Sequence, residues 1–127
     1  DAGVRYWGAL GFLIRGEESV RLNRELLLDL LEDPSAVVQI TAAEALGRYG
    51  TEGDADASLE VLLDCADAEE NGIYLATMAM NAIDYMDERA ASARARIEAL
   101  PDYDPSAHQR LRNYVVRLKE KTLSDLE

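Results

Sequence analysis

Apolar residues recur along this chain with the period of an α-helix, in segments separated by polar or glycine-containing turns. The clearest segment is DPSAVVQITAAEALGRYG at 33–50, in which Val38, Ala42 and Leu46 belong to one apolar stripe. Asp33 is a favourable helix N-cap, the proline after it suits the first helical position, and a final glycine ends the helix. The segment therefore predicts one complete amphipathic helix.

The same pattern predicts six more helices and no strand, because apolar and polar residues alternate with a period of two nowhere in the chain. The predicted helices cover 1–15, 18–32, 34–49, about 56–66, a fifth segment ending near 86, about 89–99 and about 106–125. The polar stretch TEGDAD, which contains Ala55, is expected to be a loop. Asp67 and Glu70 have capping-box spacing, and Asn71-Gly72 is expected to delay the fifth helix.

Three of these helices share one arrangement of large and small residues. The aligned sets are Val4, Val38 and Leu75; Gly8, Ala42 and Ala79; Gly11, Ala45 and Ala82; and Phe12, Leu46 and Ile83. Small residues three apart let neighbouring helices approach closely, and hairpins that cannot bury a face alone do so by stacking. We therefore predict a single all-α domain over 1–127, a short solenoid of about three helical hairpins plus a terminal helix. A plain helical bundle is the alternative.

The segments DAGVRYWGALG and DPSAVVQITAAEALGRYG resemble HEAT-type repeats, which have an Asp or Asp-Pro turn, then Val-Arg, then Ala-Ala-x-Ala-Leu, then Gly. Arg5 matches the arginine of that pattern, whereas Gln39 and Ala76 replace it in the next two units. The ladder of Asp–Arg pairs found in such solenoids is therefore expected to be largely missing. The resemblance implies a HEAT-like α-α superhelix with a structural or protein-interaction role.

A narrower resemblance covers nearly the whole chain. The matching segments are VRYWGALGFLIRG, DPSAVVQITAAEALGRYG, NGIYLATMAMNAID, ARIEALPDYDP and RLRNYVVRL. Their order is similar to the helical C-terminal extension of bacterial sulfatases of the heparan N-sulfatase (N-sulfoglucosamine sulfohydrolase) type. The resemblance implies a non-catalytic C-terminal fragment of a periplasmic or secreted hydrolase, with the catalytic domain before Asp1. The alternative is a free-standing HEAT-like protein–protein interaction module.

The net charge of −12 is unevenly distributed, with −9 of it in residues 51–100. A field of this sign repels nucleic acid and acidic lipid, so we expect neither a nucleic-acid nor a membrane partner. No apolar run approaches the roughly 20 residues of a membrane span. The last predicted helix is basic and is expected to pair with the acidic middle section. Its basic residues are Arg110, Arg112, Arg117, Lys119 and Lys121.

Few side chains could carry chemistry. Cys65 is the sole cysteine; no base accompanies it, and it is not followed by the Pro-x-Arg part of the sulfatase nucleophile motif, so we interpret it as a core residue. His108 is the sole histidine, and one histidine forms neither a metal site nor a catalytic triad. Asp54 and Asp56 lack the rest of a calcium-binding loop, so one of them is expected to cap a helix. We therefore expect no catalytic residue, metal ion or cofactor.

The first helix is the candidate binding surface, because its apolar residues surround it on more sides than one partner helix can cover. The candidate docking face consists of Tyr6, Trp7, Leu10, Leu13 and Ile14. A terminal unit of a solenoid needs a polar outer face to remain soluble, and this helix does not provide one. We expect it to dock against an upstream catalytic domain, a protein partner or a second copy of the chain.

Overall fold

The computed structural model describes residues 1–101 and 114–127, which form helices and no strand. The elements are α1 (Ala2–Arg15), α2 (Glu17–Leu22), α3 (Arg24–Leu30), α4 (Ala36–Tyr49), α5 (Glu52–Cys65), α6 (Ala68–Asn71), α7 (Ile73–Asp84), the 3₁₀ helix η1 (Asp87–Ala93), α8 (Arg94–Ala99) and α9 (Tyr114–Asp125). The predicted all-α class is confirmed.

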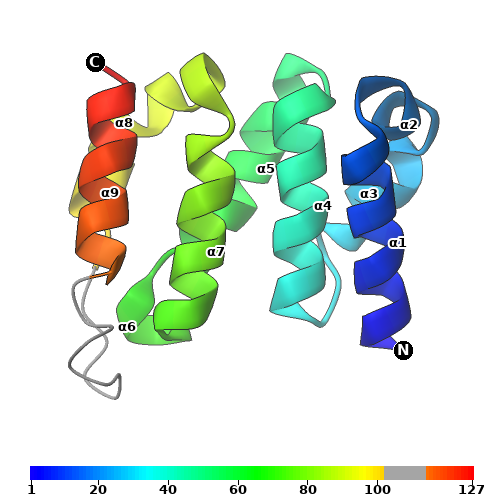
Figure 1. The fold of residues 1–127 in the computed structure, drawn as a ribbon, viewed down its shortest axis with the longest axis horizontal. Helices are drawn as coiled ribbons and strands as arrows, with labels where there is room; N and C mark the ends of the chain where they lie inside the picture. The colour runs from blue at the N-terminus through cyan, green and yellow to red at the C-terminus, as the bar shows by residue number, and fades with distance from the viewer. Residues whose placement is uncertain (102–113) are drawn as a thin grey trace.

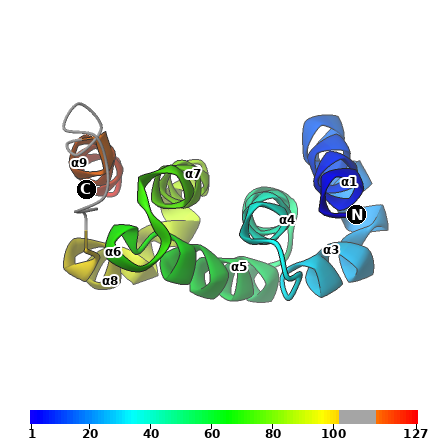
Figure 2. The ribbon, with the colours of Figure 1, turned by 90° about the horizontal axis from the view of Figure 1, so that it is seen from below.

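The helices stand in two rows (Figures 1 and 2). One row runs α1, α4, α7, α9, and each of these helices packs on the next. The other row contains α2 and α3, then α5, then η1 and α8. In the part of the chain that the structure describes, the first unit is α1 with α2 and α3, the second is α4 with α5, and the third is α7 with η1 and α8. This arrangement confirms stacked hairpins followed by a terminal helix.

The small residues of the repeat lie at the centre of the stack. Ala42 and Ala45 in α4, like Ala79 and Ala82 in α7, are fully buried. The large residues that follow them, at positions 46 and 83, are also fully buried. Alanine at these positions lets the backbones of neighbouring helices approach, and the large side chain fills the space beyond. The predicted role of both residue types is confirmed in the second and third units.

The start of α4 differs from the prediction. The N-cap is Ser35, not Asp33, although the stop at Gly50 is confirmed. The Asp33 carboxylate accepts a hydrogen bond from the Ser35 backbone N–H at 2.9 Å, in a turn just before the helix. Its other contacts are with Arg5 of α1. Asp33 therefore shapes the turn and links two helices, and the prediction that it caps α4 was wrong.

The predicted loop at TEGDAD was also wrong, because α5 begins at Glu52. The Thr51 hydroxyl accepts a hydrogen bond from the Asp54 backbone N–H, and the Asp54 carboxylate accepts one from the Thr51 N–H. This reciprocal capping box satisfies backbone donors that would otherwise lack partners. Ala55 consequently lies in the first turn of α5 and is buried there. The expectation that one of the two nearby aspartates caps a helix is confirmed.

Two predicted helices are each divided. The segment 18–32 breaks at Asn23, whose side-chain amide donates to the Ser19 carbonyl at 2.8 Å, a local bond that competes with the helix. The segment 89–99 begins as the 3₁₀ helix η1. Asp67 caps α6 as predicted, and Gly72, with φ +84°, ends α6 and delays α7. The predicted loop before α9 and the start of the last helix near 106 lie outside the described residues.

Candidate protein-interaction surface

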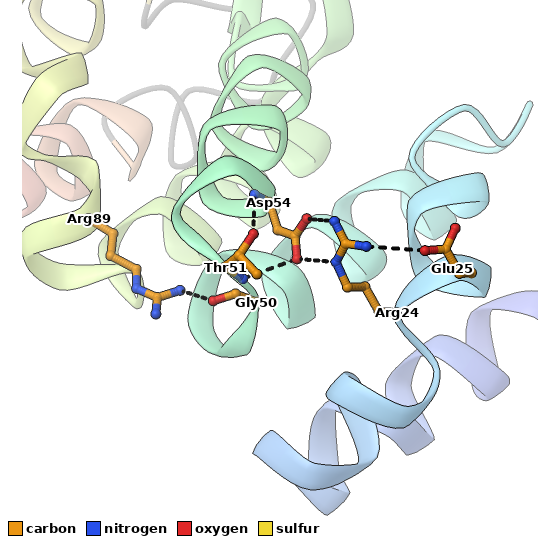
Figure 3. A network of polar contacts seen from close by, with 6 residues as sticks. All are labelled: Arg24, Glu25, Gly50, Thr51, Asp54 and Arg89. Atoms are coloured by element: carbon orange, nitrogen blue, oxygen red, sulfur yellow. Dashed lines mark hydrogen bonds and ion pairs between the residues drawn. The ribbon is translucent and has the colours of Figure 1, made fainter.

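Ion pairs join the first hairpin to the second (Figure 3). Arg24 of α3 donates from Nε and Nη2 to the two carboxylate oxygens of Asp54, each at 2.8 Å. The same carboxylate accepts the Thr51 N–H in the capping box of α5. One buried group therefore both caps α5 and binds α3 of the first hairpin. The Arg24 guanidinium, the largest influence, lowers the pKa of Asp54 below its ordinary value.

A second pair joins the same two units in the other row. Arg5 of α1 donates to both carboxylate oxygens of Asp33, and this contact is the main cause of the lowered pKa of Asp33. The sequence predicted that such a ladder would be largely missing, since Gln39 and Ala76 replace the repeat arginine. At the first junction Arg5 keeps the repeat arginine and its pair with Asp33 is present. The Arg24–Asp54 pair of the other helical row is a further contact that the sequence did not predict.

The later junctions use other donors. Arg89 of η1 donates to the backbone carbonyls of Gly47 and Gly50, the latter at 2.8 Å (Figure 3). Arg96 of α8 pairs with Glu60 of α5. Lys121 of α9 bonds Asp84 of α7 at 2.7 Å, which confirms the predicted pairing of the basic last helix with the acidic middle section. Each unit is thus attached to the next by polar contacts as well as by apolar packing.

Large apolar side chains are exposed on α1, at the N-terminal end of the stack. The exposed fractions are 69% for Val4, 69% for Trp7 and 76% for Ile14. The Trp7 ring lies edge-on to the Tyr6 ring, with 5.5 Å between the ring centres. An exposed apolar area at the end of a helical row is characteristic of an interaction surface.

The structure divides the five predicted docking residues. Trp7 and Ile14 are exposed, whereas Tyr6 and Leu10 are half-buried against the core. Leu13 is buried and packs inward, because it lies on the side of α1 that faces the other helices. In the first unit, the exposed large apolar residues outside the predicted set are Val4 on α1, Leu22 on α2 and Leu26 on α3.

The position of α1 in the repeat explains why this surface is open. Val4, Gly8 and Gly11 occupy the repeat positions of Val38, Ala42 and Ala45, which are fully buried in α4. A Cβ atom built on either glycine would meet nothing within 4 Å. We call Val4, Trp7, Gly8, Gly11 and Ile14 the open face of α1.

Several hollows lie elsewhere on the described surface, and two of them lie at opposite ends of α7. One, of about 430 Å³, is lined by Ile73, Tyr74, Thr77, Met78 and Tyr114 of α7 and α9. The other, of about 410 Å³, surrounds Arg48, whose guanidinium carbon lies 5.1 Å from the ring centres of both Tyr49 and Tyr85. The lining of the hollow at α7 and α9 is mainly apolar. In the other hollow, the Arg48 guanidinium lies near two aromatic rings.

Reactive groups are not gathered at either hollow. Among residues 1–101 and 114–127, no three carboxylate, thiol or imidazole side chains are close enough together to hold a metal ion. Cys65 is buried, and burial raises the pKa of its thiol. His108 lies outside the described residues. The described helices include none with the length and apolar character needed to cross a membrane.

Gly8→Ala is expected to increase the free energy of unfolding of this chain by up to about 1 kcal/mol, because alanine favours an exposed helix over glycine. The added methyl group meets open space. Urea unfolding followed by circular dichroism measures the change. Gly50→Ala is the matched control with the opposite sign, since its Cβ would lie 2.6 Å from the Leu46 carbonyl oxygen. A destabilised Gly8→Ala variant would show that α1 is already covered.

The two stacked rows define an α-solenoid, a class of repeat protein in which each helical hairpin packs on its neighbours. The family model of HEAT repeats matches residues 8–82, which include the second half of α1, all of α2 to α6 and most of α7. The chain belongs to the HEAT repeat family. No curated protein and no solved structure matches it. HEAT repeats have structural and protein-interaction roles, and the chain has such a role as a helical-repeat protein.

Proposed function

We propose that this chain, as one domain over 1–127, is a non-catalytic HEAT-type domain that binds another protein element on the open face of α1. The observation that carries the proposal is the exposure of Val4, Trp7 and Ile14 at the end of the first row. Their exposure leaves a large apolar area in water, which burial against a partner removes. Binding, not catalysis, is the chemistry that such a surface supports.

The element that binds belongs to the upstream part of a sulfatase-like hydrolase, of which this chain is the C-terminal domain. The support is the sequence resemblance, in which five segments occur in the same order along nearly the whole chain. The chain itself has no Cys/Ser-x-Pro-x-Arg motif, so in this proposal the catalytic nucleophile precedes Asp1. Finding that motif in the upstream reading frame would support the proposal. An upstream frame containing only further repeats would contradict the hydrolase part.

The fluorescence of Trp7, the sole tryptophan, tests the docking part directly. We expect red-shifted emission from the dilute monomeric chain, and a shift to the blue when the polypeptide encoded upstream is included. The physical reason is that docking removes water from the exposed indole ring. Emission that is already blue in the dilute monomer, or that does not respond to the upstream polypeptide, would contradict the proposal.

A second candidate function is a free-standing module that binds a basic protein. The acidic middle section favours it, because Glu52, Asp56, Asp64, Glu69 and Glu70 are all exposed. Attraction to such a partner would weaken steeply as salt is added, whereas apolar docking on α1 would not. Binding of a lysine-rich peptide that disappears at high salt and leaves Trp7 emission unchanged would favour this alternative.

A further inference from the structure

The packing of α1 on α4 shows what covers the face of α4 that is equivalent to the open face of α1. In α4, Val38 and Gly47 are nine residues apart, or two and a half turns, and therefore lie on opposite sides of the helix. A Cβ on Gly47 would lie 2.9 Å from the sulfur of Met86, which belongs to the third unit. The Gly47 side of α4 thus faces the following unit, and the Val38 side faces α1, the preceding one.

The same division applies to α1. Leu13, nine residues after Val4, is buried, and Ala9 on the same side is fully buried. The main contacts of α1 are with α4 and α2, so its buried side faces the second unit. The opposite side, with Val4, Gly8 and Gly11, corresponds to the side of α4 on which α1 lies.

Exposed apolar side chains also occur in the other row of the same unit. Leu22 on α2 is 68% exposed and Leu26 on α3 is 49% exposed. Exposed apolar side chains therefore occur on both arms of the first hairpin. A partner with two helices would cover more of them than a partner with one.

Charge argues against a second copy of the chain as the occupant. Residues 1–31 carry four basic and five acidic side chains, a net charge of −1, whereas the rest of the chain carries −11. Pairing two chains through their first units would bring two strongly acidic bodies together, and the repulsion opposes it. The net charge of the end unit itself is close to zero, so the end unit adds little repulsion against a single neighbouring hairpin.

We propose that the open face of α1 binds a helical hairpin of the same repeat type, which precedes α1 in the same polypeptide. Its first helix lies beside α1 as α1 lies beside α4, and it presents a stripe equivalent to Ile40, Ala43 and Gly47. This inference rests on the proposed function and names the part of the upstream polypeptide that touches the domain. Gly8 and Gly11 permit an approach at least as close as that at Ala42 and Ala45.

A graft of the chain's own second unit tests the proposal. Residues 33–72, which contain α4, α5 and the connection to α7, are inserted directly before Ala2. Ile73 lies 71 positions after Ala2, the sum of the two repeat spacings, so the graft preserves the natural register. We expect Trp7 emission to shift to the blue, its quenching by acrylamide to fall, and the helical circular dichroism per molecule to increase.

Two variants of the inserted copy serve as controls. Ala43→Glu places a charge in the contacting stripe and should abolish the shift of Trp7 emission, although glutamate is itself a good helix former. Gly53→Glu adds the same charge at an exposed position of α5, where a Cβ has room, and should leave the shift intact. A shift that survives Ala43→Glu would overturn the proposal, because the contact would not use the predicted stripe.

Three further outcomes would also overturn it. The first is an inserted hairpin that is helical while Trp7 emission stays unchanged. The second is an insert that remains unfolded, since α1 is proposed to supply the surface on which it packs. The third is a blue shift of the ungrafted chain as its concentration rises, which would assign the open face to a second copy. The graft contains no natural upstream polypeptide, so its failure is distinct from failure of the proposed function.

Discussion

Asp54→Ala is expected to lower the free energy of unfolding by about 3 kcal/mol, the largest effect of a single substitution that we predict. The carboxylate is 2% exposed, accepts two bonds from Arg24 and caps α5 through Thr51. Its removal takes two hydrogen bonds from the Arg24 guanidinium, which keeps only its bond to the exposed Glu25, and uncaps a helix at the same time. Both losses fall at the junction between the first and second units, so they weaken the stacking as well as α5.

Urea unfolding at neutral pH measures this loss, and Asp56→Ala is the matched control. Asp56 lies two residues further along α5 and is exposed, so its substitution makes the same change in charge without breaking the network. We expect the Asp56→Ala midpoint to stay close to that of the unmodified chain. Equal midpoints for the Asp54 and Asp56 variants would show that the Arg24–Asp54 contact contributes little.

The contribution of Asp54 also depends on pH in a defined direction. Its pKa is lowered in the folded chain, so the folded state favours the carboxylate more than the unfolded state does. The stabilisation is therefore fully present above the ordinary aspartate pKa of about 4 and is lost as the pH falls through the lower folded value. The stability difference between the unmodified chain and Asp54→Ala should shrink on acidification below about pH 4.

Leucine at Ala42 or Ala79 is expected to destabilise the chain by about 1–3 kcal/mol through overpacking. Both alanines are fully buried at equivalent positions of the repeat, where neighbouring helices are closest. A leucine there must displace a helix or adopt a strained side-chain conformation. The effect should be of similar size at both sites because they occupy the same position in successive units.

The control for these variants is Ala95→Leu on α8, where the side chain is exposed and the midpoint should hardly change. Ala55, which the sequence places in a loop, is unsuitable as a control because it is buried in α5. Urea midpoints at an unchanged slope compare the three variants. Equal midpoints would remove the support for the alignment of the repeat units.

Sequence reasoning succeeded where the evidence lies within one helix. Helical periodicity identified α4 and its buried stripe, and the same stripe in α7, because packing requires small residues at fixed spacing. It failed at Asp33, because the Asp-Pro pattern does not show that the helix begins after Ser35 and that the Asp33 carboxylate pairs with Arg5 of another helix. It failed at Ala55 because the polar residues around it were interpreted as a loop, whereas Thr51 and Asp54 form the capping box that begins α5.

Contacts between units could not be predicted from local pattern. Arg24 and Asp54 are 30 residues apart and lie on different hairpins, so their pairing depends on how the hairpins stack. The same limit applies to the candidate surface. The repeat predicts that Val4 belongs to a packed stripe, but whether a neighbour covers that stripe depends on what lies beside α1. Exposure at Val4 and burial at Leu13 therefore emerged only from the structure.

The burial of Cys65 makes the central unit observable by chemical labelling. The thiol lies at the end of α5, is 7% exposed, and has a raised pKa, so little thiolate reaches solvent while the helix is packed. A thiol reagent therefore reacts with Cys65 only when α5 separates from its neighbours. Since the chain has one cysteine, the labelling rate reports the opening of this unit alone, without any engineered probe.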